Sequence, residues 1–131
     1  MQNASESIYA SHPTEPPLKV EERDGDRVEL AFTVDPDLFQ LQGHFPGKPV
    51  LPGVAQIDWA VRFARRYLGM EGNIIRLGQL KFSALIVGGS EVRLRLDWRR
   101  AAHRLQFSYH MGEETCSSGF FELAAQELAA Q

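Results

Sequence analysis

The stretch "PGVAQIDWAVRFARRYLG", residues 52–69, has apolar residues that recur at the spacing of an α-helix. Pro52 suits the first turn of a helix, and Gly69 is typical of a helix end. The apolar positions that repeat along one side are Val54, Ile57, Ala60, Val61, Ala64 and Leu68. We therefore predict a helix over 53–68, about 24 Å long at about 1.5 Å per residue, with its apolar side centred between Ile57 and Val61.

Extended segments lie on both sides of this helix. Before it, residues 18–34 read as a hairpin that turns at Asp24-Gly25, with one face of its second strand buried. After it come four extended runs, at 73–87, 90–98, 104–111 and 115–123. The first of these is apolar on both faces, which predicts a central strand covered on both sides. The next two alternate apolar and polar residues, as half-buried strands do.

The order of elements is therefore two strands, one helix and four strands. Short turns between the later strands predict an antiparallel sheet, and a single helix buries its apolar side only if the sheet curls around it. We predict an α+β fold in which five or six antiparallel strands wrap around one central helix. Residues 18–131 are expected to form this single domain. Residues 1–17 are polar and lack periodicity, which predicts a flexible N-terminal arm or a segment laid over the surface.

Composition excludes several classes of protein. The 131 residues are 44% hydrophobic and 24% charged with a net charge of −3, so the basic excess of a nucleic-acid-binding protein is absent. The sequence shows neither a signal peptide nor a run long enough to span a membrane, which predicts a cytoplasmic protein. Cys116 is the only cysteine, so it has no disulfide partner in the chain, and we expect it to be a buried filler.

The segment "GHFPGKPVLPGVAQID", residues 43–58, carries the candidate chemistry. Its prolines exclude a helix before Pro52 and stiffen the backbone. They present His44, a base suited to neutral pH, just before a helix start whose free N–H groups attract anions. Asp58 lies on the flank of the apolar side of the helix. Simpler interpretations are a loop histidine bonded to backbone and a surface Asp58 paired with Arg62 one turn later.

Together, "GHFPGKPVLPGV" and the acidic residue fourteen positions after the histidine resemble a family signature. It is that of the hotdog-fold (3R)-hydroxyacyl-ACP dehydratases of fatty-acid synthesis. The variant "LPGVAQIDWA" is most similar to stand-alone dehydratases of the aryl-polyene and specialised fatty-acid type. The resemblance spans roughly residues 18 to 123. It implies the hotdog fold, a sheet wrapped around one long helix, which agrees with the prediction from the order of elements.

The resemblance implies a mechanism and its residues. His44 would remove the C2 proton, Asp58 would protonate the leaving hydroxyl, and the Gly53 N–H would stabilise the thioester oxygen. In the family, histidine and acid come from different subunits, which implies a homodimer or larger homo-oligomer. Neither a metal nor a redox cofactor is implied. The partner would be an acidic acyl carrier protein, and the basic residues that lie near enough to dock it are Lys48, Arg62, Arg65 and Arg66.

Two departures leave other functions open. The family branch that the motif resembles most carries Glu where this chain has Asp58, and both branches usually carry Gln where it has Arg62. A hotdog acyl-thioesterase, in which Asp58 activates water, is one alternative. A non-catalytic acyl-binding module that kept the fold is the other. The acyl chain, the use of coenzyme A in place of the carrier, and any isomerase activity are left open. His103 and His110 lie at turn and polar-face positions and are not expected to be catalytic.

Overall fold

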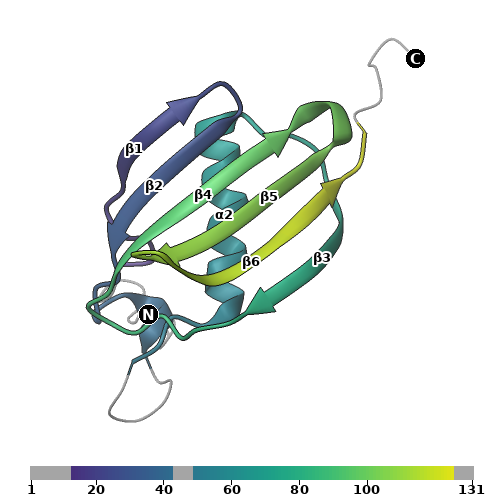
Figure 1. Ribbon diagram of the computed structural model, residues 1–131. Helices are drawn as coiled ribbons and strands as arrows, with labels where there is room; N and C mark the ends of the chain where they lie inside the picture. The colour runs from purple at the N-terminus through teal and green to yellow at the C-terminus, as the bar shows by residue number, and fades with distance from the viewer. Residues whose placement is uncertain (1–12, 43–48, 126–131) are drawn as a thin grey trace, which may run out of the picture.

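The computed structural model describes residues 13–42 and 49–125, and within them it holds six β-strands and a single α-helix. The strands are β1 (Lys19–Asp24), β2 (Arg27–Thr33), β3 (Ile74–Phe82), β4 (Glu91–Arg99), β5 (Arg104–Met111) and β6 (Glu114–Leu123), and the helix is α2 (Gly53–Leu68). Every strand pairing is antiparallel, in the order β1-β2-β4-β5-β6-β3. Figure 1 shows the sheet curving around α2. The predicted α+β hotdog architecture is confirmed.

The ends of α2 are the predicted ones, but its buried side is not. The helix runs over Gly53–Leu68, and Gly69 closes it in the left-handed conformation with φ of +62°. The side chains that face the sheet are Ala55, Gln56, Trp59, Ala60, Phe63, Ala64 and Leu68. Ile57 and Val61 are only partly buried, and Val54 is 76% exposed. The predicted centre of the apolar side, between Ile57 and Val61, is therefore wrong because Trp59 and Phe63 determine which side packs on the sheet.

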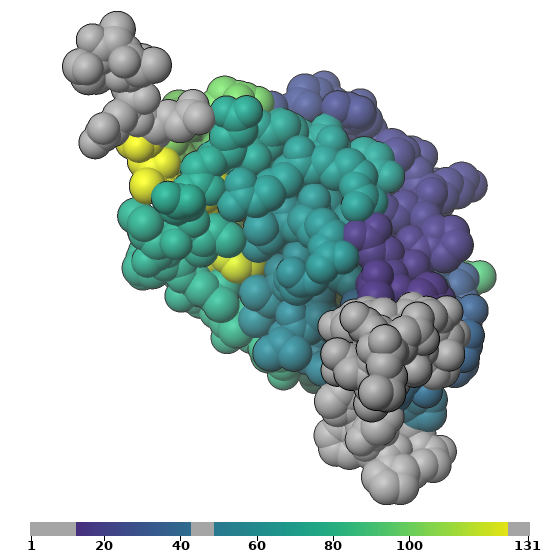
Figure 2. All heavy atoms as spheres, turned by 180° about the vertical axis from the view of Figure 1, so that it is seen from behind, coloured from purple at the N-terminus to yellow at the C-terminus, as the bar shows by residue number. Residues whose placement is uncertain are grey.

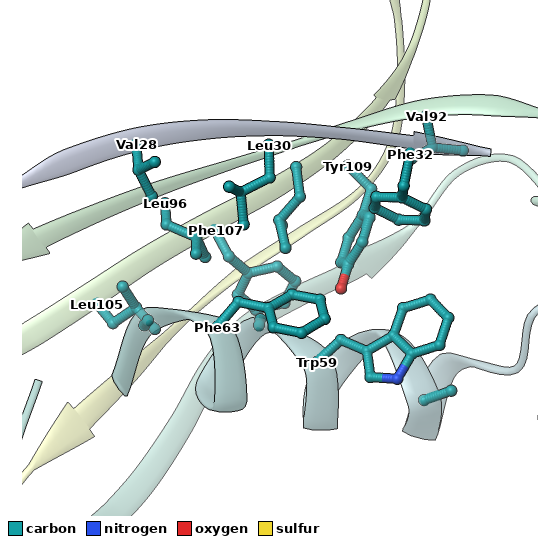
Figure 3. Close-up of a cluster of buried hydrophobic side chains, with 14 of the residues drawn as sticks. Val28, Leu30, Phe32, Trp59, Phe63, Val92, Leu96, Leu105, Phe107 and Tyr109 are labelled. Atoms are coloured by element: carbon teal, nitrogen blue, oxygen red, sulfur yellow. The ribbon is translucent and has the colours of Figure 1, made fainter. Parts of the chain in front are cut away.

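A single hydrophobic core fills the space between α2 and the inner face of the sheet. Figure 3 shows Trp59 and Phe63 of α2 pointing toward Phe32, Phe107 and Tyr109 of the strands. The Phe32 and Trp59 rings meet edge to face, with centroids 5.6 Å apart. Burying one such aromatic side chain stabilises the fold by about 1.5–3 kcal/mol, so these residues account for much of the attachment of α2.

β3 lies at an edge of the sheet rather than at its centre. Among the strands of the described residues it pairs only with β6, while β4 takes the place beside β2. Its side chains are largely exposed, including Ile75 and Leu77. The prediction of a central strand covered on both sides is therefore wrong for this single chain. The apolar composition that suggested it remains, and it lies at the surface.

The connections hold one further departure from prediction and one segment that lies on the surface of the domain. One turn of 3-10 helix, Phe39–Leu41, precedes Pro52, where no helix is expected. Residues 13–17 lie along the surface of the domain, anchored by a hydrogen bond from the Phe39 N–H to the Pro13 carbonyl. Residues 1–12 of the predicted arm lie outside the described residues. No helix in the described ranges is long and apolar enough to cross a membrane.

Candidate active site

The amino-terminal end of α2 presents backbone donors at the surface. Pro52 precedes the helix with extended backbone, φ of −64° and ψ of 152°, and the first intrahelical hydrogen bonds come from the N–H groups of Ala55 and Gln56. The N–H groups of Gly53 and Val54 therefore have no acceptor within the helix. No side chain among residues 13–42 and 49–125 caps this end. Such an end favours a partial negative charge on a bound group.

Phe82, at the end of β3, lies directly on Gly53. A Cβ atom added to Gly53 would be 2.7 Å from Cζ of the Phe82 ring, a distance that side chains do not tolerate without moving. The ring itself is about half exposed, at 49%. A glycine at this position thus lets the apolar wall of β3 approach the backbone donors closely.

Asp58 lies one turn further along the exposed side of α2. It shares this side with Val54, four residues before it, and Arg62, four residues after it. Its side chain is 55% exposed, and Nη2 of Arg62 donates to its carboxylate at 2.7 Å. The simpler interpretation of Asp58, a surface pair with Arg62, is therefore present in the single chain. The exposed Val54 beside it shows that this side is not purely polar.

Glu15 brings the N-terminal segment onto the same helix. Its carboxylate accepts hydrogen bonds from Nη1 of Arg62 at 2.8 Å and from Nη2 of Arg66 at 3.0 Å. Burial alone would raise the pKa of Glu15, but the two guanidinium groups lower it below its usual value. Figure 2 shows α2 at the surface, between the purple N-terminal residues and β3. Arg62 thus bridges Glu15 and Asp58.

The structure places only some of the predicted site residues. His44 and Lys48 lie outside the described residues. Gly53 lies at the start of α2 as predicted, whereas Asp58 lies on the exposed side of the helix and not on the flank of its buried side. Of the proposed docking residues, Arg62 and Arg66 are paired with Glu15, and Nη2 of Arg65 donates to the Gly72 carbonyl at 2.9 Å. These three guanidinium groups are therefore engaged within the chain.

Sequence reasoning missed Gln56, a polar side chain that is only 3% exposed. Its Nε2 donates to the Leu51 carbonyl at 3.1 Å, and its Oε1 accepts from Oγ of Ser117 at 2.6 Å. Its backbone carbonyl accepts from the Tyr109 hydroxyl at 2.7 Å. The signal in the sequence was a glutamine on the face where Trp59 and Phe63 recur at helical spacing, which only the correct choice of buried face reveals.

Other candidate chemistries find little support in the described ranges. Cys116 is buried as expected, and burial raises the pKa of its thiol, which disfavours a nucleophilic role. No three His, Cys, Asp or Glu side chains of the described residues lie together in a way that could hold a metal ion. A hollow of about 540 Å³ lies on the outer face of the sheet, where Arg95, Ser108 and Ser118 line it. Neither Gly53 nor Asp58 lines this hollow.

The chain is similar to known proteins in sequence and in fold. The family model described as ApeI-like, ApeI dehydratase, matches residues 20–120. A 3-hydroxyacyl-[acyl-carrier-protein] dehydratase FabZ from Alkaliphilus metalliredigens is 31% identical over 94 residues, and the match covers 64% of this chain and 64% of that protein. The chain thus spans less than two thirds of the length of this curated relative.

Two solved structures are similar over nearly their whole length. A chain of "The Dehydratase Heterocomplex ApeI:P" from Xenorhabdus doucetiae superposes with a TM-score of 0.78 at 30% identity, covering 85% of this chain and 99% of that chain. An uncharacterized protein from Erwinia carotovora subsp. atroseptica superposes with a TM-score of 0.71 at 38% identity, covering 84% of this chain and 96% of that chain.

Proposed function

The chain belongs to the ApeI-like dehydratase family, and from this we propose that it removes water from a (3R)-3-hydroxyacyl thioester carried on an acyl carrier protein. The C2–H bond and the C3–O bond break, a double bond forms between C2 and C3, and water leaves, giving a trans-2-enoyl thioester. The observation that carries the proposal is the span of the family match, residues 20–120, which includes His44, Gly53 and Asp58.

Three groups carry out the proposed reaction. His44 removes the C2 proton, since a neutral imidazole is an effective base near pH 7. The Gly53 N–H, at the uncapped start of α2, donates to the thioester oxygen as negative charge develops there, which is worth on the order of 3 kcal/mol. Asp58 gives its proton to the departing hydroxyl group. Neither a metal ion nor a redox cofactor is required for this step.

We propose further that Asp58 serves the site of a second copy of the chain. Its side of α2 is open and carries the exposed Val54, and the neighbouring edge of β3 exposes Ile75, Leu77 and Phe82. Exposed apolar surface of this kind is typical of a protein–protein interface. A second copy that covers this side would also enclose the start of α2. Because the Xenorhabdus relative is named a heterocomplex, a different partner chain is the alternative that a mass measurement must test.

The pairing of Asp58 with Arg62 favours a second candidate function. Nη2 of Arg62 donates to Asp58, so the carboxylate is held as a hydrogen-bond acceptor in the single chain. An ionised carboxylate is what a hotdog thioesterase would need as the general base that activates water. Dehydration instead requires Asp58 to hold a proton. Dehydration therefore predicts an enoyl product with Asp58 as the acid, whereas thioester hydrolysis predicts a free thiol with Asp58 as the base.

The carrier protein is the expected partner of either reaction. Acyl carrier proteins are acidic, and Arg65 and Arg66 are exposed residues on the last turns of α2. Docking on Arg62 or Arg66 would compete with Glu15, which already pairs with both. Arg65 donates to backbone carbonyls and not to a carboxylate, so we expect Lys48 and Arg65 to contribute more to docking than Arg62 and Arg66.

One experiment separates the functions. Purified protein is incubated with (3R)-3-hydroxyacyl-ACP and, separately, with saturated acyl-ACP, and both enoyl product and free thiol are measured. Dehydration predicts enoyl product from the first substrate, lowered by about 10²-fold or more in His44→Ala and in Asp58→Asn. His110→Gln is the matched control, because the ring of this histidine contacts Ser108 and Thr115 on the strands, and the variant should keep full activity.

The remaining outcomes decide against dehydration. Free thiol without enoyl product would show a thioesterase, and binding without any product would show an acyl-binding module. Repeating the assay with acyl chains of different length, and with coenzyme A in place of the carrier, would define the substrate.

A further inference from the structure

Gln56 joins three separate parts of the fold at the start of α2. Its side-chain amide bonds the Leu51 carbonyl before the helix and the Ser117 hydroxyl on β6. Its backbone carbonyl bonds the Tyr109 hydroxyl on β5. All three partner residues are buried. The first turn of the helix is thus tied to two strands and to the segment that precedes it.

A buried amide is a costly way to gain stability. Removing an amide from water costs free energy unless its donors and acceptors are satisfied, and an apolar side chain of the same size would avoid that cost. An amide whose donors and acceptors are satisfied fixes orientation, because its hydrogen bonds hold their partner groups in one geometry. The Gln56 network therefore fits a role in orienting the groups that it bonds better than a role in stabilising the fold alone.

The geometry shows which groups the network would position. Leu51 lies two residues before Gly53, and its N–H donates to the Ile86 carbonyl at 2.8 Å. Its carbonyl accepts from Gln56, so both polar groups of this residue are fixed. Gly53 follows after Pro52, whose ring restricts the backbone further. The Gly53 N–H therefore lies between a residue that is fixed by two hydrogen bonds, Leu51, and the first turn of α2.

We propose that Gln56 is a positioning residue that orients the Gly53 N–H and the segment leading into it. This inference rests on the proposed function, in which that N–H stabilises charge in the transition state. A donor that is already in place needs no reorganisation during the reaction, and a shift of about 1 Å can cost about 10²-fold in rate. Loss of the network should therefore lower kcat and leave KM nearly unchanged, because the thioester oxygen gains its charge only in the transition state.

The test compares Gln56→Leu with a core variant of similar stability cost. Leu105→Val is the control, since Leu105 is fully buried on β5 and Figure 3 places it away from Trp59 and Tyr109. We expect Gln56→Leu to lower kcat about 10-fold and to change KM by no more than about twofold. We expect Leu105→Val to keep the wild-type kcat, although its Tm falls as much as that of Gln56→Leu or more. Ser117→Ala should lower kcat less, and adding it to Gln56→Leu should have little further effect, because both act through one network.

A second measurement does not depend on activity. Amide hydrogen exchange at Leu51, whose N–H is bonded to Ile86, should become about 10-fold faster in Gln56→Leu and remain unchanged in Leu105→Val. Unchanged exchange at Leu51, or an equal loss of kcat in both variants, would overturn the positioning role. If the wild-type chain forms no enoyl product, the proposed function fails by itself, and the exchange result still decides whether Gln56 fixes this segment.

Discussion

His110 is buried beside two hydroxyl groups, with two arginines and one glutamate close enough to act on its charge. It is only 9% exposed on β5, with Nε2 2.7 Å from Oγ of Ser108 and Nδ1 3.3 Å from Oγ1 of Thr115. Burial lowers the pKa of this imidazole, Arg95 and Arg93 lower it further, and Glu29 only partly opposes them. The folded protein therefore favours the neutral ring, which agrees with a structural role for this histidine.

This environment predicts that the protein loses stability on mild acidification. The pKa of His110 is lower in the folded than in the unfolded chain, where it is near 6.5, so the unfolded chain binds the proton first as the pH falls. The free energy of unfolding should fall below about pH 6.5, by at most about 1.4 kcal/mol per pH unit from this one group. Above that pH the contribution is flat.

Urea unfolding at about pH 7.5, 6.5 and 5.5 measures this effect in the wild type and in His110→Gln. Between pH 6.5 and 5.5 the free energy of unfolding should fall less in the variant than in the wild type. Above pH 7 the imidazole should add no pH dependence to the free energy of unfolding of the wild type. Glu15 and Glu122, whose pKa values lie below the usual value, contribute losses only at lower pH, with the pKa of Glu122 near 2. Equal slopes in both proteins would show that His110 does not titrate during unfolding.

Among the elements, β3 has the least regular geometry. Its register against β6 shifts between Gly78 and Lys81, and Gln79 within the shift has a φ of +49°. The Phe120 ring covers Gly78 from β6, while Phe82 of β3 covers Gly53 of α2. β3 therefore depends on two aromatic–glycine contacts, one toward the sheet and one toward the helix.

These two contacts should differ in their response to an added methyl group. Arg104 and Arg76 lie over the Phe120 ring, with Cζ atoms 3.9 Å and 5.0 Å from its centroid, so the ring has little freedom to move. We expect Gly78→Ala to lower the free energy of unfolding by about 1–3 kcal/mol, as overpacking does. Gly53→Ala should cost less, because the half-exposed Phe82 ring can turn away.

Urea unfolding compares the two alanine variants, and Phe120→Leu is the second substitution that tests the cause. Gly78→Ala combined with Phe120→Leu should lose less than the sum of the two single changes, because the smaller side chain makes room for the methyl group. A fully additive double variant would contradict a clash between residue 78 and the Phe120 ring.

The sequence predicts where a helix or strand ends better than it predicts which side of that element is buried and what packs against it. Gly69 and the Asp24-Gly25 turn show where the chain stops or reverses, because that information is local. The burial of Trp59 and Gln56 depends on which side of α2 the sheet covers, which local spacing does not determine. The edge position of β3 depends on pairing with β6, about forty residues later, and therefore could not be predicted from the composition of β3. The His44 motif identified the family because it is specific, not because its spacing defined a geometry.

The whole sheet has two edges of opposite character. β1 exposes charged side chains along its length, including Lys19, Glu21 and Glu22, which discourage pairing with another sheet. β3 exposes isoleucine, leucine and phenylalanine side chains. An apolar edge that no described residue covers suits the second copy proposed above. The same chain therefore discourages association at one edge and favours it at the other.

Mixing two inactive variants tests whether the second chain completes the site. If His44 of one chain works with Asp58 of its partner, a dimer of His44→Ala with Asp58→Asn has one site in which both residues are wild type and one in which both are changed. Equal mixing with subunit exchange should therefore restore about a quarter of wild-type dehydration, since about half of the dimers are mixed and each has one working site.

Two further results decide the interpretation. If both residues serve one site within a single chain, every site in the mixture lacks one of them and no activity returns. Leu77→Asp introduced into both variants places a charge on the exposed edge of β3, and it should abolish the recovery and yield monomers by light scattering. Full recovery with Leu77→Asp present would show that the chains join through another surface.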